Sequence, residues 1–174
     1  SSRSLDLAHN LPKGWSAAPI SAVCGGGLFT DGDWIESKDQ DPAGTIRLIQ
    51  LADIGDGVFL NRSNRWISAE TALRLGVTKL HRGDILLARM PDPIGRSCFF
   101  PLDIDAITAV DVCIIRPMPE VCDRRWLVQA LNSPSMRAKI AQQANGTTRQ
   151  RISRGNLATI ELPVPPFPEQ GRIA

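Results

Sequence analysis

The apolar residues of this chain come in short runs separated by turns, and this pattern limits the elements that the chain can form. A run such as Ile85-Leu86-Leu87-Ala88 falls far short of the roughly 20 residues that a membrane-spanning helix needs. Short apolar runs bounded by turns are typical of buried strands. The chain has 174 residues, which is enough for one domain with one sizeable core. We therefore expect a single soluble globular domain.

Five segments have the composition of strands. They are rich in β-branched or apolar residues, and glycine, proline or aspartate lies beside most of them. The run 109–116 is apolar almost throughout apart from Asp111, which predicts a central strand buried on both faces. The predicted strands are residues 45–51, 85–90, 97–100, 109–116 and 157–162.

Helical patterns occur in two places. Ser68 is a suitable N-cap for a short helix that ends at Gly76. Residues 126–131 and 136–144 have helical spacing, and Ser133-Pro134 between them provides a cap and a first helical residue. Strands mixed with short helices, without regular βαβ alternation, predict an α+β fold around a twisted, mostly antiparallel or mixed sheet.

A long acidic loop is predicted between the first glycine triplet and the first clear strand. Residues 30–44 are rich in aspartate and turn formers, so they should lie on the surface. Trp34-Ile35 is the apolar pair within this loop. We expect both side chains to anchor the loop to the body of the domain.

The cysteines and histidines do not form a metal-binding pattern. Cys24, Cys98, Cys113 and Cys122 are scattered without a CxxC pair, and the chain has only two histidines. Cysteines in such apolar settings are more often small core residues than disulfide partners. We therefore expect free thiols, no metal, no cofactor and a reducing cytoplasmic location.

Positive charge is concentrated in two stretches. Residues 124–160 hold seven basic residues and no acidic one, and residues 57–101 hold a further seven basic residues against three acidic ones. Segregated positive charge is expected of a surface that binds a polyanion, although a solvated surface can have the same composition.

The catalytic signatures that we considered are incomplete. Gly25-Gly26-Gly27 lacks the spacing of a phosphate-binding loop, and neither histidine lies in a recognisable nucleophile arrangement. Val164-Pro165-Pro166-Phe167 has valine where an amino-methyltransferase needs a hydrogen-bonding side chain for the flipped base. No lysine follows the candidate carboxylates at the spacing of a metal-dependent nuclease. We therefore expect a non-catalytic chain.

The segment 145–154, with sequence NGTTRQRISR, is the most informative one for binding. Arginine and glutamine can make paired hydrogen bonds to guanine and adenine edges, whereas threonine, serine and backbone amides commonly hold phosphates. Gly146 allows a turn that exposes the run, although a solvated loop after a helix is an alternative. The DNA-binding residues that we predict are Thr147, Thr148, Arg149, Gln150, Arg151 and Arg154, with Arg89 and Arg96 from the other basic stretch.

Three motifs in order resemble one family. The chain has Leu11-Pro12-Lys13-Gly14-Trp15 near its start, GDILLAR at 83–89 followed by IGR at 94–96, and GTTRQRIS at 146–153 running into LPVPPFPEQGRIA at 162–174. In this order they resemble the target recognition domain of type I restriction-modification specificity subunits. Two departures, Gly25-Gly26-Gly27 without a following Thr-Pro and Ala109-Val110-Asp111 in place of an Asn-Gln pair, affect the expected DNA target more than the role.

The resemblance implies a role within a complex. Two such domains, joined by helices, each read half of a bipartite site in double-stranded DNA. They position adenine methyltransferase subunits and, in the full assembly, a translocating restriction subunit. The expected partners are therefore duplex DNA, the modification methyltransferase subunit, the restriction subunit and a second recognition domain.

The same resemblance divides the chain. We expect a disordered leader over residues 1–10, a recognition domain over residues 11–166, and the start of the spacer helix at residues 167–174. The seven residues 168–174 are too few for a helix that is stable on its own, so we expect it to be frayed. The resemblance implies that the full helix pairs with its counterpart from the other half, so we expect this form to be largely monomeric. The alternatives are a recognition domain from a fused single-chain enzyme and a protein-interaction module with a basic face.

Overall fold

The computed structural model describes residues 10–146 and 149–174 of the chain. Its central layer is a four-stranded antiparallel sheet with the order β2-β8-β5-β6. The strands are β2 (Leu28–Thr30), β8 (Val112–Arg116), β5 (Ile85–Ala88) and β6 (Ser97–Phe99). β8 and β5 are the two inner strands, and every residue of β5 is buried. The central position predicted for the 109–116 segment is therefore confirmed, although the strand begins only at Val112.

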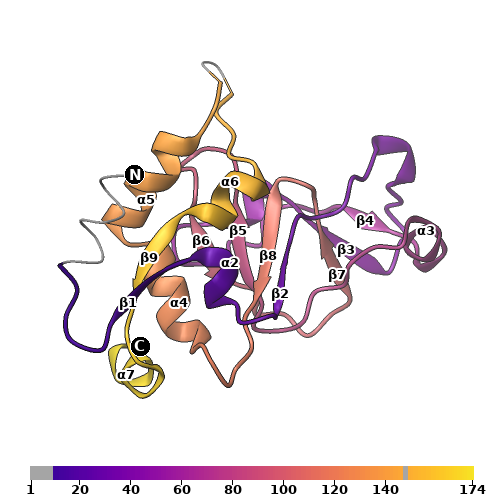
Figure 1. Cartoon of the computed structure of the whole chain (residues 1–174). Helices are drawn as coiled ribbons and strands as arrows, with labels where there is room; N and C mark the ends of the chain where they lie inside the picture. The colour runs from indigo at the N-terminus through magenta and orange to yellow at the C-terminus, as the bar shows by residue number, and fades with distance from the viewer. Residues whose placement is uncertain (1–9, 147–148) are drawn as a thin grey trace.

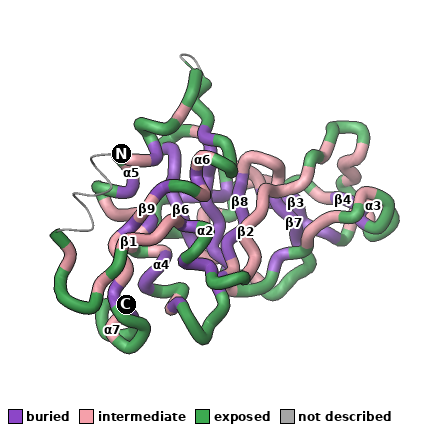
Figure 2. The backbone as a smooth tube through the Cα atoms, in the orientation of Figure 1, coloured by how far each residue is buried: buried purple, intermediate pink, exposed green. Residues whose placement is uncertain are grey.

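Both faces of this sheet are covered. Ile85, Leu87, Cys113 and Ile115 point into one core cluster, and the residues that alternate with them, such as Leu86 and Ile114, point into a second. This two-sided burial explains why the two inner strands are apolar without alternation. Figure 2 shows β8 among the buried segments in the middle of the molecule.

Helices cover the first face of the sheet. They are α2 (Ile20–Val23), α4 (Arg124–Leu131), α5 (Pro134–Gln143) and α6 (Arg154–Thr159), and the first core cluster contains residues from all four. A two-stranded sheet of β1 (Ser16–Pro19) and β9 (Glu161–Val164) lies beside them (Figure 1). In the described chain no helix is long and apolar enough to cross a membrane.

A second, smaller group of elements extends from the other face. It contains the sheet β4-β3-β7, formed by β4 (Trp66–Ile67), β3 (Ile46–Ile49) and β7 (Ala106–Thr108), together with α3 (Ala69–Leu75) (Figure 1). β3 and β7 pair in parallel, whereas the other strand pairs are antiparallel. Two 3-10 turns, η1 (Ser37–Asp39) and η2 (Leu51–Asp53), complete the elements apart from the last helix. The mixture of helices and sheets confirms the predicted α+β class.

The predicted helix signals are confirmed in detail. Ser68 accepts a hydrogen bond from the Thr71 amide, and Gly76 ends α3 in the left-handed conformation. Ser133 caps α5 in the same way, with Pro134 at its first residue.

Three local predictions are wrong. The last strand is shorter than expected, because Ser153 caps α6 and Leu157 lies in that helix. Ile35 packs against a core cluster, but Trp34 is 72% exposed and does not anchor its loop. The last helix, α7 (Phe167–Ile173), is formed and docked instead of frayed.

The docking of α7 depends on Gln170. Its side chain is buried, accepts a hydrogen bond from the Asp123 amide and donates one to the Pro165 carbonyl. These contacts hold α7 beside the start of α4. The sequence-based expectation of fraying considered the helix alone and did not include these tertiary contacts.

Candidate nucleic-acid interface

Three strands of the central sheet bring charged residues to the same end of the sheet. Arg89 directly follows β5, Asp111 directly precedes β8, and Asp31 directly follows β2. Because β8 runs antiparallel to both neighbours, all three positions lie at the same end of the sheet.

The Arg89 guanidinium lies between the other two charged residues at this end of the sheet, and Arg89 is only 2% exposed. Its Nε is 3.0 Å from Asp31 Oδ1, and its Nη2 is 3.5 Å from Asp111 Oδ1. The guanidinium also donates to the Ile152 carbonyl at 3.0 Å and to the Val110 carbonyl at 2.7 Å. A buried charge needs such compensation, so Arg89 fixes both carboxylates and the chain around Ile152.

Arg151 and Arg154 lie on the outer side of the two carboxylates. Arg151 Nη2 is 2.9 Å from Asp111 Oδ1, and Arg154 Nε is 3.6 Å from Asp31 Oδ2. Both arginine side chains are about half exposed, at 49% and 46%. Three guanidinium groups thus share two carboxylates, which leaves a positive charge at the surface. We call these five residues the arginine cluster, and a hollow of about 400 Å³ opens beside it.

The 145–151 loop is closed at its base beside the arginine cluster. The amide and carbonyl of Asn145 each pair with those of Arg151 at 2.9 Å, and this part of the chain projects from the body (Figure 1). Gly146 has a φ of +104°, and a Cβ there would lie 2.5 Å from the Arg149 carbonyl oxygen. Ile152 is fully buried directly after the loop, so the exposed residues are attached to a fixed base.

The structure brings some of the predicted DNA-binding residues together. Arg149 and Gln150 are exposed in the loop, and Arg151 and Arg154 lie in the arginine cluster. Thr147 and Thr148 lie outside the described residues. Arg89 belongs to the same cluster, but its burial makes it a support for the exposed arginines and not a surface contact.

Arg96 lies elsewhere, and the structure does not place it on a surface. It is only 6% exposed, and its guanidinium donates to the carbonyls of Leu51, Ile54, Met90 and Pro93. Burial lowers its pKa, while the charge of Asp92 opposes this effect. These contacts tie two loops to the sheet, so we assign Arg96 a structural role instead of the predicted DNA contact.

The basic stretch 57–101 does not form one continuous surface. Besides the buried Arg89 and Arg96, Arg74 pairs with Asp39 at 2.8 Å. Arg82 lies before β5, at the end of the strand opposite to Arg89. Charge counting along the sequence therefore overestimated the positive surface in this stretch.

Sequence reasoning missed the two carboxylates of the arginine cluster. Asp31 and Asp111 are 80 positions apart; Asp31 lies in the predicted acidic loop, and Asp111 is part of a departure from the family pattern. One signal was available for Asp111, since it is the one charged residue among the apolar residues 109–115. A charge at the end of a buried strand needs a partner, which pointed to a fixed ion pair.

The four cysteines are free and buried, as predicted. Burial raises the pKa of Cys24 to about 11 and that of Cys98, Cys113 and Cys122 to about 12. Within residues 10–146 and 149–174, no three His, Cys, Asp or Glu side chains are grouped in a way that could hold a metal ion.

The sequence also matches a family model over most of its length. The model is that of the type I restriction modification DNA specificity domain, and it matches residues 21–174. This chain belongs to that family. No curated protein matches the sequence. The match to the family model confirms the resemblance found in the sequence motifs. It assigns the domain a role in DNA sequence recognition.

Solved structures share the fold of this chain. The chain is similar to the HsdS subunit from Thermoanaerobacter tengcongensis, with a TM-score of 0.69 and 22% identity over 94% of this chain and 36% of that one. It is also similar to a chain from a structure on complex assembly and conformational transition of the type I R-M system, with a TM-score of 0.68 and 22% identity over 98% and 40% of the two chains.

The type I S subunit from M. genitalium has a TM-score of 0.60 and 19% identity over 96% of this chain and 38% of that one. At these identities the likeness concerns the fold. This DNA specificity domain spans about two fifths of the length of the chains that it resembles.

Proposed function

We propose that this specificity domain reads one half of a bipartite site in double-stranded DNA through the 145–151 loop and the arginine cluster. The observation that carries the proposal is the pairing of exposed Arg151 and Arg154 with carboxylates held by buried Arg89. A guanidinium held near a fixed carboxylate loses less conformational entropy than an unpaired arginine when it binds a phosphate or a guanine edge.

The ion pairs of the arginine cluster would also allow Arg151 to exchange Asp111 for a DNA phosphate. The Asp111 Oδ1 and Arg89 Nε atoms are buried, and neither makes a well-directed hydrogen bond in the described chain. Their ion pairs are therefore close but poorly aligned. A DNA phosphate that approaches Arg151 can take over part of its interaction with Asp111 at a modest cost.

In this proposal, catalysis belongs to other subunits. The domain is a non-catalytic component that directs adenine methylation and DNA restriction by a methyltransferase subunit and a restriction subunit. A recognition domain within a fused single-chain enzyme would read DNA in the same way.

Titration of labelled duplex DNA with the domain tests the binding step. We expect weak binding that becomes weaker with added salt, because arginine contacts to phosphates release counterions. An Arg151→Gln/Arg154→Gln variant should bind less tightly and with a shallower salt dependence. Arg62→Gln/Arg65→Gln is the matched control, since it removes two exposed arginines of another segment. Absence of binding at low salt, or binding indifferent to salt, would contradict the proposal.

A further inference from the structure

A second, larger hollow lies at the opposite end of the central sheet. Its volume is about 860 Å³, within the range of ligand-binding clefts. Arg82 and Gly83 precede β5, and Pro117 follows β8, so the hollow adjoins the strand ends that face away from the arginine cluster. The strands separate the two sites by about 13 Å or more, at about 3.3 Å per residue. We call this hollow the α4 groove.

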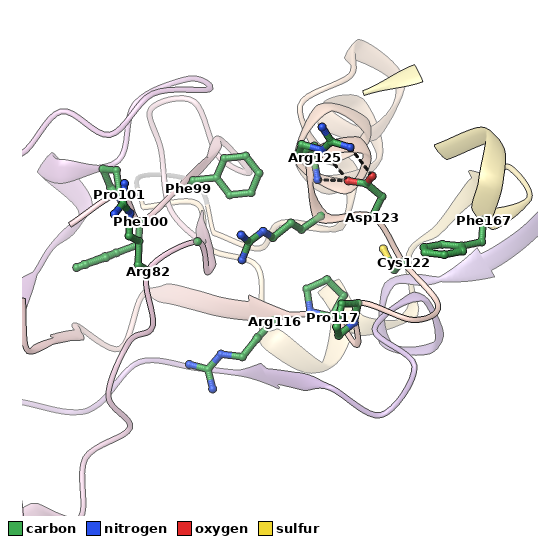
Figure 3. Close-up of a pocket in the computed structure, with 13 residues that line it drawn as sticks. Arg82, Phe99, Phe100, Pro101, Arg116, Pro117, Cys122, Asp123, Arg125 and Phe167 are labelled. Atoms are coloured by element: carbon green, nitrogen blue, oxygen red, sulfur yellow. Dashed lines mark hydrogen bonds and ion pairs between the residues drawn. The ribbon is translucent and has the colours of Figure 1, made fainter. Parts of the chain in front are cut away.

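The walls of the α4 groove are largely apolar. Phe99 and Pro101 form one side, and Phe167 of α7 lies on the other, with Pro117 between them (Figure 3). Phe167 is 45% exposed, although phenylalanine side chains in folded proteins are usually buried. Short rigid walls of proline and phenylalanine suit one inserted apolar side chain.

The rim of the α4 groove is basic. Two of its arginines are occupied by carboxylates. Arg116 binds buried Asp84 at 2.7 Å, and Arg125 binds Asp123 at 3.0 Å (Figure 3). The other two are available. Arg82 has only exposed Asp103 at 3.9 Å, and no carboxylate lies within ion-pair distance of Arg124 in the described chain.

The position of Arg124 favours an anionic ligand. It is the first residue of α4, where the helix dipole disfavours a cation, so the helix gains no stability from it. Its guanidinium lies over the backbone of Gly83, and a Cβ at that glycine would lie within 2.9 Å of three guanidinium atoms. The absence of a side chain at Gly83 thus lets Arg124 extend along the groove towards Arg82.

We infer that the α4 groove binds an acidic segment of a protein partner. An apolar side chain of that segment lies between Phe99 and Phe167, and its flanking carboxylates pair with Arg82 and Arg124. The combination of an apolar hollow and two available arginines suits a peptide better than a duplex, whose phosphates gain nothing from aromatic walls. Since the groove and the arginine cluster lie at opposite strand ends, the domain can hold both ligands at once.

Amide NMR titration of the isotope-labelled chain with a short synthetic peptide, one leucine flanked by glutamates, tests this inference. We expect saturable shifts confined to the residues around Phe99, Cys122 and Phe167. Peptides with serine in place of leucine, or lysine in place of glutamate, should bind at least about tenfold more weakly, a difference of about 1.4 kcal/mol.

Matched variants distinguish peptide binding in the α4 groove from a general attraction of the peptide to positive charge. Arg82→Gln/Arg124→Gln should weaken peptide binding at least about tenfold, and Arg62→Gln/Arg65→Gln should change it by less than about twofold. If Arg124→Gln disturbs the fold, Arg82→Gln alone keeps the test valid, because that side chain is exposed. No saturable shift in the groove, equal weakening by both pairs, or the same shifts with short duplex DNA would overturn the inference. If the domain failed to bind DNA, the proposed function would fail, but the inference about the α4 groove would remain.

Discussion

Arg89 directly follows β5 and lies between two carboxylates, and these carboxylates are the partners of Arg151 and Arg154. A buried arginine is stable only when its donors and its charge are compensated. In this domain the same charges serve two purposes, because they stabilise the interior and orient the exposed arginines.

The role of Asp111 can be separated from simple electrostatics. Asp111→Asn removes a negative charge near the proposed DNA, so binding to arbitrary duplexes should become stronger by roughly 1 kcal/mol. Arg151 would lose its partner, so discrimination between sequences should fall at the same time. Binding isotherms on several unrelated duplexes measure both effects. Asp103→Asn, an exposed change at the opposite strand ends, is the control, and unchanged discrimination in Asp111→Asn would contradict the positioning role.

The structural role of Arg96 gives a different prediction. Arg96→Ala removes a donor from four main-chain carbonyls, of which Leu51 and Pro93 keep a backbone donor. It should reduce the free energy of unfolding by roughly 2–5 kcal/mol, because each buried carbonyl left unsatisfied costs about 1–3 kcal/mol. Urea denaturation measures this change. Arg62→Ala, an exposed substitution, should remain within about 0.5 kcal/mol of the parent. A stable Arg96→Ala domain with weakened DNA binding would restore the role predicted from the sequence.

Among the elements, the 145–151 loop depends most on one backbone conformation. Gly146→Ala combines a positive φ with a clash against the Arg149 carbonyl, so the loop has to rearrange. Because the loop is exposed, we expect a loss of unfolding free energy of only about 1–2 kcal/mol but a clear loss of DNA affinity.

Gly26→Ala is the matched control for this change. Gly26 has a φ of +88°, but no atom lies within 4 Å of a Cβ at that position. It should carry a similar backbone strain without affecting DNA binding. Equal DNA affinity in the two variants, measured by fluorescence anisotropy, would show that the loop conformation does not matter.

The elements that could be predicted have local causes. Ser68, Gly76 and Ser133-Pro134 determine helix ends by their own hydrogen bonds and backbone preferences. The inner strands are recognisable because burial on both faces requires apolar residues at every position. β7 has only three residues and pairs in parallel with a strand about 60 positions earlier, so its formation depends on contacts that no local pattern records.

The candidate site was predictable only in part for the same reason. The 145–154 segment carries its hydroxyl, amide and guanidinium groups in one run, so sequence reasoning could find it. The burial of Arg89 and Arg96 and the partners of Arg151 follow from how distant strands meet. The exposure of Trp34 is a similar case, since its sequence neighbour Ile35 alone reaches the core.

At the scale of the whole molecule, the buried thiols make stability depend on alkaline pH. In the unfolded chain the thiols lose their protons around the ordinary pKa of 9.0, whereas in the fold their pKa is about 11 to 12. The folded state therefore binds more protons above pH 9, and stability falls as pH rises through this window.

Urea denaturation from about pH 8 to about pH 10.5 measures this effect. Each fully contributing thiol lowers the free energy of unfolding by about 1.4 kcal/mol per pH unit. A Cys98→Ala variant should show a shallower decline than the parent. A stability that stays constant across the same window would contradict the burial of the thiols.

Selection from a duplex library with a randomised central segment tests the central claim most directly, because sequence reading and charge attraction give different results. The parent domain should enrich one short motif. A variant with Arg149, Gln150 and Arg151 all changed to alanine should lose that motif while it remains folded, with a cost of about 1–3 kcal/mol for each base-reading contact. Enrichment of the same motif by both proteins, or of no motif by the parent, would contradict the account.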